Sequence, residues 1–241
     1  MKYVKTIGMI VLMIMLVKTT AIGQSDYKIT FYRAAPGQLL QLIEEVKKKS
    51  RAFQEVDYQP TVIRHSQGDH WDLLIVEFIG NRADYFAQGA LDEVFSPQYG
   101  DDFYALTSYH ESFIARGPEI ATVHSVLSES DYFHFEIFVA LAGKQRELLK
   151  QRQMENEYLK EIGRSPNLIF TINGTAKWDC FTIGGYRDIK HFAESADIPL
   201  EKEEEAAKKA GFKGVNDISP YLRSLIDTHQ DTLGGKVKLE Q

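Results

Sequence analysis

Three histidines in the first half of the chain carry side chains that can accept a proton or bind a metal ion. His65 and His70 lie on either side of a short polar turn, and His110 lies later in the same half. Brought together, they would form a three-nitrogen site for a metal or haem iron, or supply a general base. Their spacing matches no standard metal motif, so separate histidines at the surface are the alternative. We take His70 and His110 as candidate catalytic residues and His65 as a candidate ligand-binding residue.

Two polar residues occupy helix positions that should face a buried sheet. Arg152 and Asn156 fall on the inner stripe of a predicted helix, where the matching helix of the first half has a valine and a serine. Burying a charge and an amide without partners would be costly. We therefore expect pairing with Glu155, Glu136 or the carboxylate of a ligand, for which arginine offers two parallel hydrogen bonds. The alternative is a helix turned so that both side chains reach water.

Arg64 and His229 complete the candidate ligand-binding set. Arg64 lies in a predicted strand, from which it can point into a barrel and bind an anion, or extend to the sheet edge. His229 precedes the last predicted strand, near the position of His110 in the first half, so the two could line opposite ends of one cavity. The expected ligand contacts are thus Arg64, His65, Arg152, Asn156 and His229. The sequence leaves the cofactor unspecified.

The single cysteine and the absent motifs narrow the chemistry further. Cys180 is the only cysteine, so no disulfide can form within the chain, and no adjacent base is evident. We expect a buried, unreactive thiol. No glycine-rich phosphate loop, HExxH helix or CxxC pair occurs, which argues against nucleotide-binding, zinc-peptidase and thiol-redox functions.

A tryptophan-aspartate pair occurs twice in the same setting. Trp71-Asp72 and Trp178-Asp179 each follow a polar turn and open a predicted strand, and 107 positions separate the copies. A period of that length indicates a duplicated domain rather than a solenoid. We expect the tryptophan to fill core volume and the aspartate to accept hydrogen bonds from amides of the turn. Residues that differ between the copies are then the candidates for function.

Hydrophobic periodicity predicts the order β-α-β-β-α-β in both halves. In the first half, strands are expected near 27–33, 61–65, 71–79 and 108–115, with helices near 39–53 and 81–86. In the second half, strands are expected near 134–139, 167–172, 178–186 and 228–239, with helices near 144–162 and 187–195 and inserted helices at about 197–227. The last strands align Glu111 with Asp231, and no element is assigned to 118–133.

This order is that of the ferredoxin-like unit, and the chain resembles the dimeric α/β-barrel superfamily. The resemblance lies in the strand-Pro-Gly-helix opening from Phe31 to Leu42 and in the hairpin from His65 to Phe78. It implies an α+β fold in which two ferredoxin-like βαββαβ repeats form one pseudo-dimeric α/β barrel around a cavity, with helices outside. The superfamily includes stress-responsive barrel proteins, small monooxygenases, muconolactone isomerases and haem proteins related to chlorite dismutase, so the fold does not fix an activity.

The first 23 residues have the layout of a secretory signal peptide. Two lysines precede an apolar run over 7–17, and small residues up to Gly23 offer a cleavage site. Cleavage near Gly23 would export a first repeat over 24–117 and a second over 118–241, with no stable membrane anchor. The net charge of −6, without a basic stripe, argues against nucleic-acid binding. The composition is compatible with an oligomer.

These observations predict an exported tandem α/β-barrel protein that binds a small organic ligand in the barrel cavity. The first alternative is an oxygenase- or isomerase-type enzyme, with or without haem or a metal, in which a histidine acts as general base or axial ligand. The second alternative is an interaction or assembly protein whose inserted helices dock a partner.

Overall fold

The computed structural model of the protein describes residues 24–52, 59–80, 82–87, 101–172, 174 and 176–239. The predicted signal peptide, residues 1–23, lies outside the described residues. Within these ranges, no helix combines the length and the apolar character needed to cross a membrane.

Both halves contain alternating strands and helices. The first half consists of β1 (Gln24–Ala34), α1 (Leu39–Ala52), β2 (Thr61–Gln67), β3 (Leu73–Gly80), α2 (Arg82–Tyr85), α4 (Asp101–Tyr104) and β4 (Thr107–Pro118). The helix α5 (Ile120–Glu129) leads into the second half. That half consists of β5 (Tyr132–Ala140), α6 (Gln145–Glu161), β6 (Leu168–Ile172), β7 (Cys180–Tyr186), α7 (Ile189–Ala193), η3 (Glu194–Asp197), α8 (Leu200–Lys209), η4 (Val215–Asp217), α9 (Ile218–Arg223) and β8 (Ile226–Lys236).

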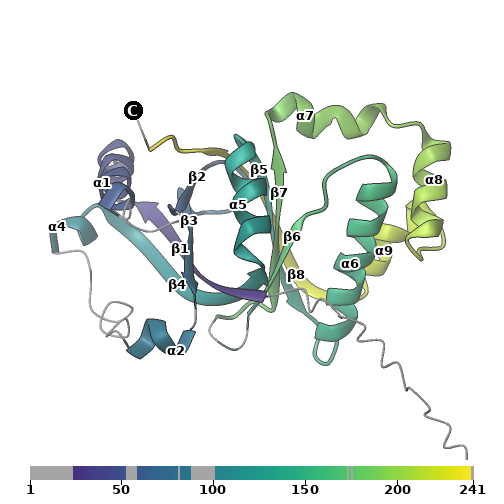
Figure 1. Cartoon of the computed structure of the whole chain (residues 1–241), viewed down its shortest axis with the longest axis horizontal. Coiled ribbons are helices and arrows are strands. Elements are labelled where there is room, and N and C mark those ends of the chain that lie inside the picture. Colours follow the sequence, from purple (N-terminus) through teal and green to yellow (C-terminus); the bar gives the residue numbers. More distant parts are fainter. Residues whose placement is uncertain are drawn as a thin grey trace, which may run out of the picture.

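The strands form one closed barrel in the order β1-β3-β2-β8-β5-β7-β6-β4, and neighbouring strands are antiparallel. The strand order β4-β1-β3-β2 of the first half recurs as β8-β5-β7-β6 in the second. The halves meet at two seams, one between β2 and β8 and one between β4 and β6. Figure 1 shows the halves side by side, with α1 and α6 on opposite outer sides and α8 and α9 beyond α6. The predicted α+β barrel is confirmed.

The turn from the first strand into the first helix has the same geometry in both halves. Gly37 and Gly143 have φ angles of 79° and 80°, in the left-handed region that favours glycine. One turn into each helix, Leu42 and Leu148 are both completely buried. A separation of 106 residues therefore relates α1 to α6.

The two Trp-Asp pairs have an architectural role. Both tryptophans are buried in the barrel core. Asp72 Oδ2 accepts a hydrogen bond from the backbone N of Ala34 at 2.7 Å, and Asp179 Oδ2 accepts one from the backbone N of Ala140 at 2.7 Å. These amides belong to the ends of β1 and β5 and not to the hairpin turns, so each aspartate joins the third strand of its half to the first.

The centre of the barrel is packed with aromatic rings from both halves. The centroid of the Phe31 ring lies 5.3 Å from that of Trp71 and 5.4 Å from that of Trp178. Phe113 and Phe135 approach the same ring at 6.1 and 5.6 Å. The cavity expected in the middle of the barrel is therefore not found among the described residues, because side chains from facing strands fill that space.

The helix α5, which was not predicted, closes one end of the barrel. Val123 and Leu127 are 2% and 3% exposed and belong to the same core as the strand residues. They line a small space together with Tyr27, near the start of β1. The β2–β3 and β6–β7 hairpin turns project from the opposite end, because β1 and β5 run in the same direction around the closed sheet.

The last strands align one residue differently from the sequence expectation. Thr30 lies opposite Ser112 in the first half, and Glu136 lies opposite Asp231 in the second. Asp231 therefore corresponds to Ser112 and not to Glu111. The antiparallel hydrogen-bond register sets this correspondence, whereas the expected alignment rested on similarity of residue type.

Candidate functional site

The structure places the three first-half histidines in separate surroundings. The His110 ring lies on the outer face of the sheet, 6.0 Å from the Tyr32 ring and nearly parallel to it. His65 packs 5.6 Å from a core tryptophan, and His70 lies in the hairpin turn, 5.1 Å from the Tyr109 ring. Their ring nitrogens do not converge in the described part of the chain, so the expected three-nitrogen site is not formed.

His229 and Arg64 also lie away from the barrel interior. His229 stands opposite Phe138 as His110 stands opposite Tyr32, so the two histidines occupy equivalent positions. The His229 ring is stacked on Phe138 at 5.8 Å, on the side of the sheet that α6 covers. Arg64 is exposed. His110 and His229 therefore do not line opposite ends of one interior cavity, although His229 borders a cleft at the end of the barrel.

Arg152 is buried under α6, where it has the two carboxylate partners that the sequence predicted. Its side chain is 2% exposed, Nη1 lies 3.6 Å from Oε2 of Glu136, and Nη2 donates to Glu155. The guanidinium also lies 4.7 Å from the centre of the Phe138 ring. Burial raises the pKa of Glu155, although Arg152 opposes this shift. Contacts within the protein thus account for the burial of Arg152 without a ligand.

Asn156 also uses its amide within the protein. Its Nδ2 donates to the backbone O of Asn167, and its Oδ1 accepts from the backbone N of Asn167, both at 2.8 Å. The expected partners were Glu155, Glu136 or a ligand carboxylate, whereas the partner in the structure is the loop before β6. Asn156 therefore fixes that loop to α6.

A cleft of about 310 Å³ opens at the end of the barrel away from α5. Ile137, Val139 and Trp178 give it an apolar wall. Polar residues from both halves complete the lining: His70, Lys177, Thr228, His229 and Gln230. A neighbouring depression also contacts His70 and Gln230. Apolar walls with a few polar groups are typical of sites for small organic molecules.

A buried carboxylate holds His70 at the rim of this cleft. Nδ1 of His70 lies 2.5 Å from Oδ1 of Asp69. The His70 side chain is 48% exposed, whereas that of Asp69 is 4% exposed. With the proton on Nδ1, the Nε2 atom is an acceptor, and it has no hydrogen-bond partner among the residues that the structure describes. A carboxylate behind an imidazole orients the ring and stabilises its protonated form, as a general base requires.

The same hairpin contains three buried polar atoms that have no hydrogen-bond partner in the described protein. They are Nε2 of His65, Oδ2 of Asp69 and Nε1 of Trp71. Buried polar atoms are nearly always satisfied, by water or a ligand where the protein offers no partner. The hairpin beside the cleft is therefore a place where a bound polar molecule would gain hydrogen bonds.

A second polar cluster, which the sequence reasoning missed, lies under α6 in the second half. His134 Nε2 is 3.4 Å and His229 Nε2 is 3.0 Å from the two carboxylate oxygens of Asp231. The hydrogen bond from His134 lowers the pKa of Asp231. Burial alone would lower the pKa of His134, but Asp231, Glu136 and Glu155 outweigh it and raise that pKa. The sequence signal for this cluster was the spacing of two between ionisable residues, which places His134 and Glu136 on one face of β5 and His229 and Asp231 on one face of β8.

Asp69, which lies behind His70, and Lys177, in the cleft lining, have roles that were not predicted. The structure supports the expectation for Cys180. Asp69 directly precedes His70 in the sequence, and this adjacency was the signal for the pair. Lys177 holds in the second half the position that His70 holds in the first, directly before the Trp-Asp pair. Cys180 is completely buried, and burial raises the pKa of its thiol to about 12.

No family model and no curated protein matches the sequence. Solved structures match the fold. An anthrone oxidase-like protein has a TM-score of 0.60 at 15% identity, over 89% of this chain and 92% of its own. A candidate monooxygenase from Fusobacterium nucleatum has a TM-score of 0.53 at 12% identity, over 88% and 92% of the two chains. A candidate chlorite dismutase has a TM-score of 0.51 at 12% identity, over 90% and 96%. The chain therefore has the dimeric α+β-barrel fold, from which no activity follows.

A haem-dependent version of the protein would need an axial histidine, and the two histidines expected in that role, His110 and His229, do not fit it. The His110 ring is covered by Tyr32 and Tyr104, at 6.0 and 5.4 Å. Nε2 of His229 is taken by Asp231 at 3.0 Å. In the described part of the chain, neither imidazole has a ring nitrogen free to bind a haem iron.

Proposed function

We propose that the chain binds a small planar organic molecule in the cleft and removes a proton from it. The Asp69–His70 pair carries this proposal, because it combines a buried carboxylate with an exposed imidazole beside an apolar wall. Ile137, Val139 and Trp178 suit a flat apolar ligand. The likeness in fold to an anthrone oxidase-like protein and to a candidate monooxygenase supports chemistry on a ligand of this general kind.

In the proposed step, Nε2 of His70 accepts the proton of an activated C–H group, and the electron pair stays on the ligand as an enolate. Asp69 stabilises the imidazolium through the hydrogen bond to Nδ1. The ammonium of Lys177 lies 5.8 Å from the centre of the Trp178 ring and would attract the anion. Return of the proton to the same or another carbon completes the reaction without a further reactant.

Deuterium exchange tests this function. Planar compounds with an activated C–H are first screened for binding by thermal shift, and the ligands found are incubated with the protein in D₂O. We expect carbon-bound deuterium to appear about 10²–10⁴-fold more slowly with His70→Gln than with the wild type, since a general base contributes that much. Proton NMR of the ligand measures the rate.

His191→Gln is the matched control, because His191 lies partly exposed on α7 and is absent from the cleft lining. It should exchange the ligand at the wild-type rate. Equal rates for His70→Gln and the wild type would contradict the assignment of His70 as the base. Binding by the wild type without any exchange would instead favour a protein that only binds its ligand.

We also infer that the chain arose by tandem duplication of a ferredoxin-like βαββαβ unit, with repeats over 24–117 and 118–241. The repeated strand order and the paired Trp-Asp contacts support this origin. Export after cleavage near Gly23 is proposed on the layout of residues 1–23. Amino-terminal sequencing of the exported protein should begin near Gln24, and an intact first segment would contradict cleavage.

A further inference from the structure

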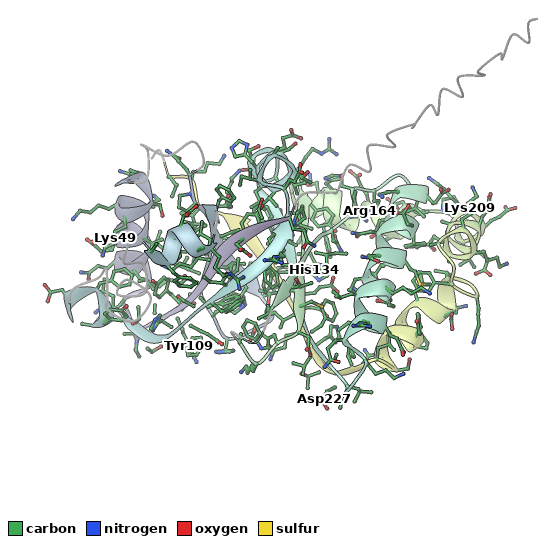
Figure 2. All side chains as sticks on the ribbon, turned by 60° about the horizontal axis from the view of Figure 1, so that its bottom comes forward. Lys49, Tyr109, His134, Arg164, Lys209 and Asp227 are labelled. Atoms are coloured by element: carbon green, nitrogen blue, oxygen red, sulfur yellow. The ribbon has the colours of Figure 1, made fainter. Side chains whose placement is uncertain are left out.

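Outside the cleft, three side chains of metal-binding type converge on the outer face of the second half. A ring nitrogen of His134 and carboxylate oxygens of Glu136 and Asp231 all lie within 4.8 Å of one another. The register brings them together, since Glu136 stands directly opposite Asp231 and His134 lies two residues from Glu136 on the same face. Figure 2 shows His134 near the middle of the molecule.

The charges at this place favour an added cation. Like charges directly opposite on neighbouring strands repel, and Glu136 is only 8% exposed. Glu155 adds a third carboxylate from α6, and Arg152 supplies one positive charge to Glu136 and Glu155. Three carboxylates thus share one guanidinium at this place. Excess charge at a buried interface is costly, and a divalent cation would neutralise it.

His229 holds the most exposed of the three donors in position. Its Nε2 lies 3.0 Å from Oδ2 of Asp231, while Oδ1 of the same carboxylate faces His134 at 3.4 Å. A ligating carboxylate that is itself hydrogen-bonded by a neighbouring residue is typical of metal sites. The Asp231 side chain is 51% exposed, which gives an ion a path from solvent.

The fold itself does not require these donors. In the first half, Lys28, Thr30 and Ser112 occupy the equivalent strand positions. The hydroxyls of Thr30 and Ser112 are hydrogen-bonded to each other at 2.9 Å. A neutral pair therefore suffices at this point of the barrel, and the second half departs from it in three residues at once.

We propose that His134, Glu136 and Asp231 bind one divalent transition-metal ion of the zinc type, with His229 positioning Asp231. An imidazole nitrogen combined with carboxylate oxygens suits such ions. Three protein ligands leave a fourth coordination position for water or another molecule. This site lies on the outer face of the sheet, and its three ligands are absent from the lining of the proton-transfer cleft. His229 borders both sites, and Asp231 also lines the depression beside the cleft.

Zinc titration of the untagged full chain, after treatment with EDTA and dialysis, tests the site by calorimetry. We expect one ion per chain and a higher thermal midpoint at saturation. Asp231→Asn and His134→Gln should each weaken zinc binding by at least about tenfold, the effect typical of lost ligands and their supports. His191→Gln, which removes a partly exposed histidine outside the cluster, should bind zinc as the wild type does.

Cobalt(II) absorption gives an independent readout, because visible bands of a bound ion should be seen with the wild type and lost with Asp231→Asn. The latter keeps side-chain size at a half-exposed position, so it should fold even where His134→Gln does not. Absence of saturable zinc binding by the wild type would overturn the proposal. Unchanged affinity in Asp231→Asn would overturn it equally, because the ion would then lie elsewhere.

Discussion

The two halves of the barrel share their strand order, turn geometry and Trp-Asp contacts, but they differ in what lies between sheet and helix. Under α1, the Thr30 and Ser112 hydroxyls bond to each other, and Val46 of the helix is 1% exposed in an apolar cluster. The helix contributes no charge at this position, because α1 has Val46 where α6 has Arg152. Apart from Lys28, which is 8% exposed on the same face of β1, the interface consists of apolar side chains and local hydrogen bonds.

Under α6, the equivalent positions hold Glu136, Asp231 and Arg152, and the arginine is as buried as the valine. A buried charged interface is commonly no more stable than an apolar one of similar volume, since desolvation offsets the attraction. The barrel therefore gives no structural reason for the charges. The comparison teaches that features present twice build the fold, whereas features present once indicate chemistry.

Replacing Arg152 should have the largest effect. Arg152→Val introduces the residue found at the equivalent position of α1 and leaves Glu136 and Glu155 without their guanidinium. We expect the free energy of unfolding, measured with urea, to fall by about 3–5 kcal/mol. Adding Glu136→Thr should recover part of this loss, since it removes one of the unpaired charges. If Arg152→Val lowered the free energy of unfolding by less than about 1 kcal/mol, the charged interface under α6 would tolerate valine as the interface under α1 does, and the contrast between the halves would be wrong.

The shared aspartates should give the next largest effect, and an equal one in both halves. Asp72→Ala and Asp179→Ala each leave a strand-end amide without its acceptor. We expect each to lower the free energy of unfolding by about 1–3 kcal/mol in denaturant melts. A clear difference between the two variants would show that the two aspartate contacts contribute unequally to stability.

The neutral pair of the first half should have a smaller effect. Thr30→Val removes one partner of the hydrogen bond to Ser112, and we expect a loss of about 1 kcal/mol in the free energy of unfolding. Because the cost comes mainly from the stranded hydroxyl, the double change with Ser112→Ala should lie close to the wild type. A double variant that is less stable than Thr30→Val would contradict this account.

The titration of His110 should give the smallest effect. Burial lowers the pKa of His110, and Glu111 only partly opposes this shift. The folded protein therefore takes up this proton at lower pH than the unfolded chain, whose histidine pKa is about 6.5. Stability from this group is present above that pH and is lost as the pH falls from there toward the folded pKa. Histidine-detected NMR should show a midpoint below the unfolded value, and a raised midpoint would refute it.

Much of the fold could be predicted because each half repeats the same pattern, and the Trp-Asp pairs fixed the register of the third strands. The helix α5 could not be predicted with the same tools. It is ten residues long and contains Thr122, Val123 and Val126, which are weak helix formers. An isolated helix of this length is unstable, so its formation depends on the barrel end that it covers.

The candidate sites were predictable only in part. His70 was identified by residue type. The burial of the Asp69 side chain and the apolar wall of the cleft could not be predicted, because both depend on how the two halves pack. The cluster around Asp231 was hidden by a one-residue error in alignment. In a strand, a shift of one residue moves a side chain to the opposite face, so matching Asp231 with Glu111 removed it from the face of His134 and Glu136.

The pairing of β8 has a consequence for how the chain is made. This 11-residue strand pairs with β2 on one side and with β5 on the other. It is also synthesised after every other strand of the barrel. Until it has emerged from the ribosome, β2 and β5 present open edges, and the aromatic core between the halves has one side uncovered. The nascent chain must therefore avoid pairing with other chains up to its final strand, whose arrival decides whether the barrel closes upon itself.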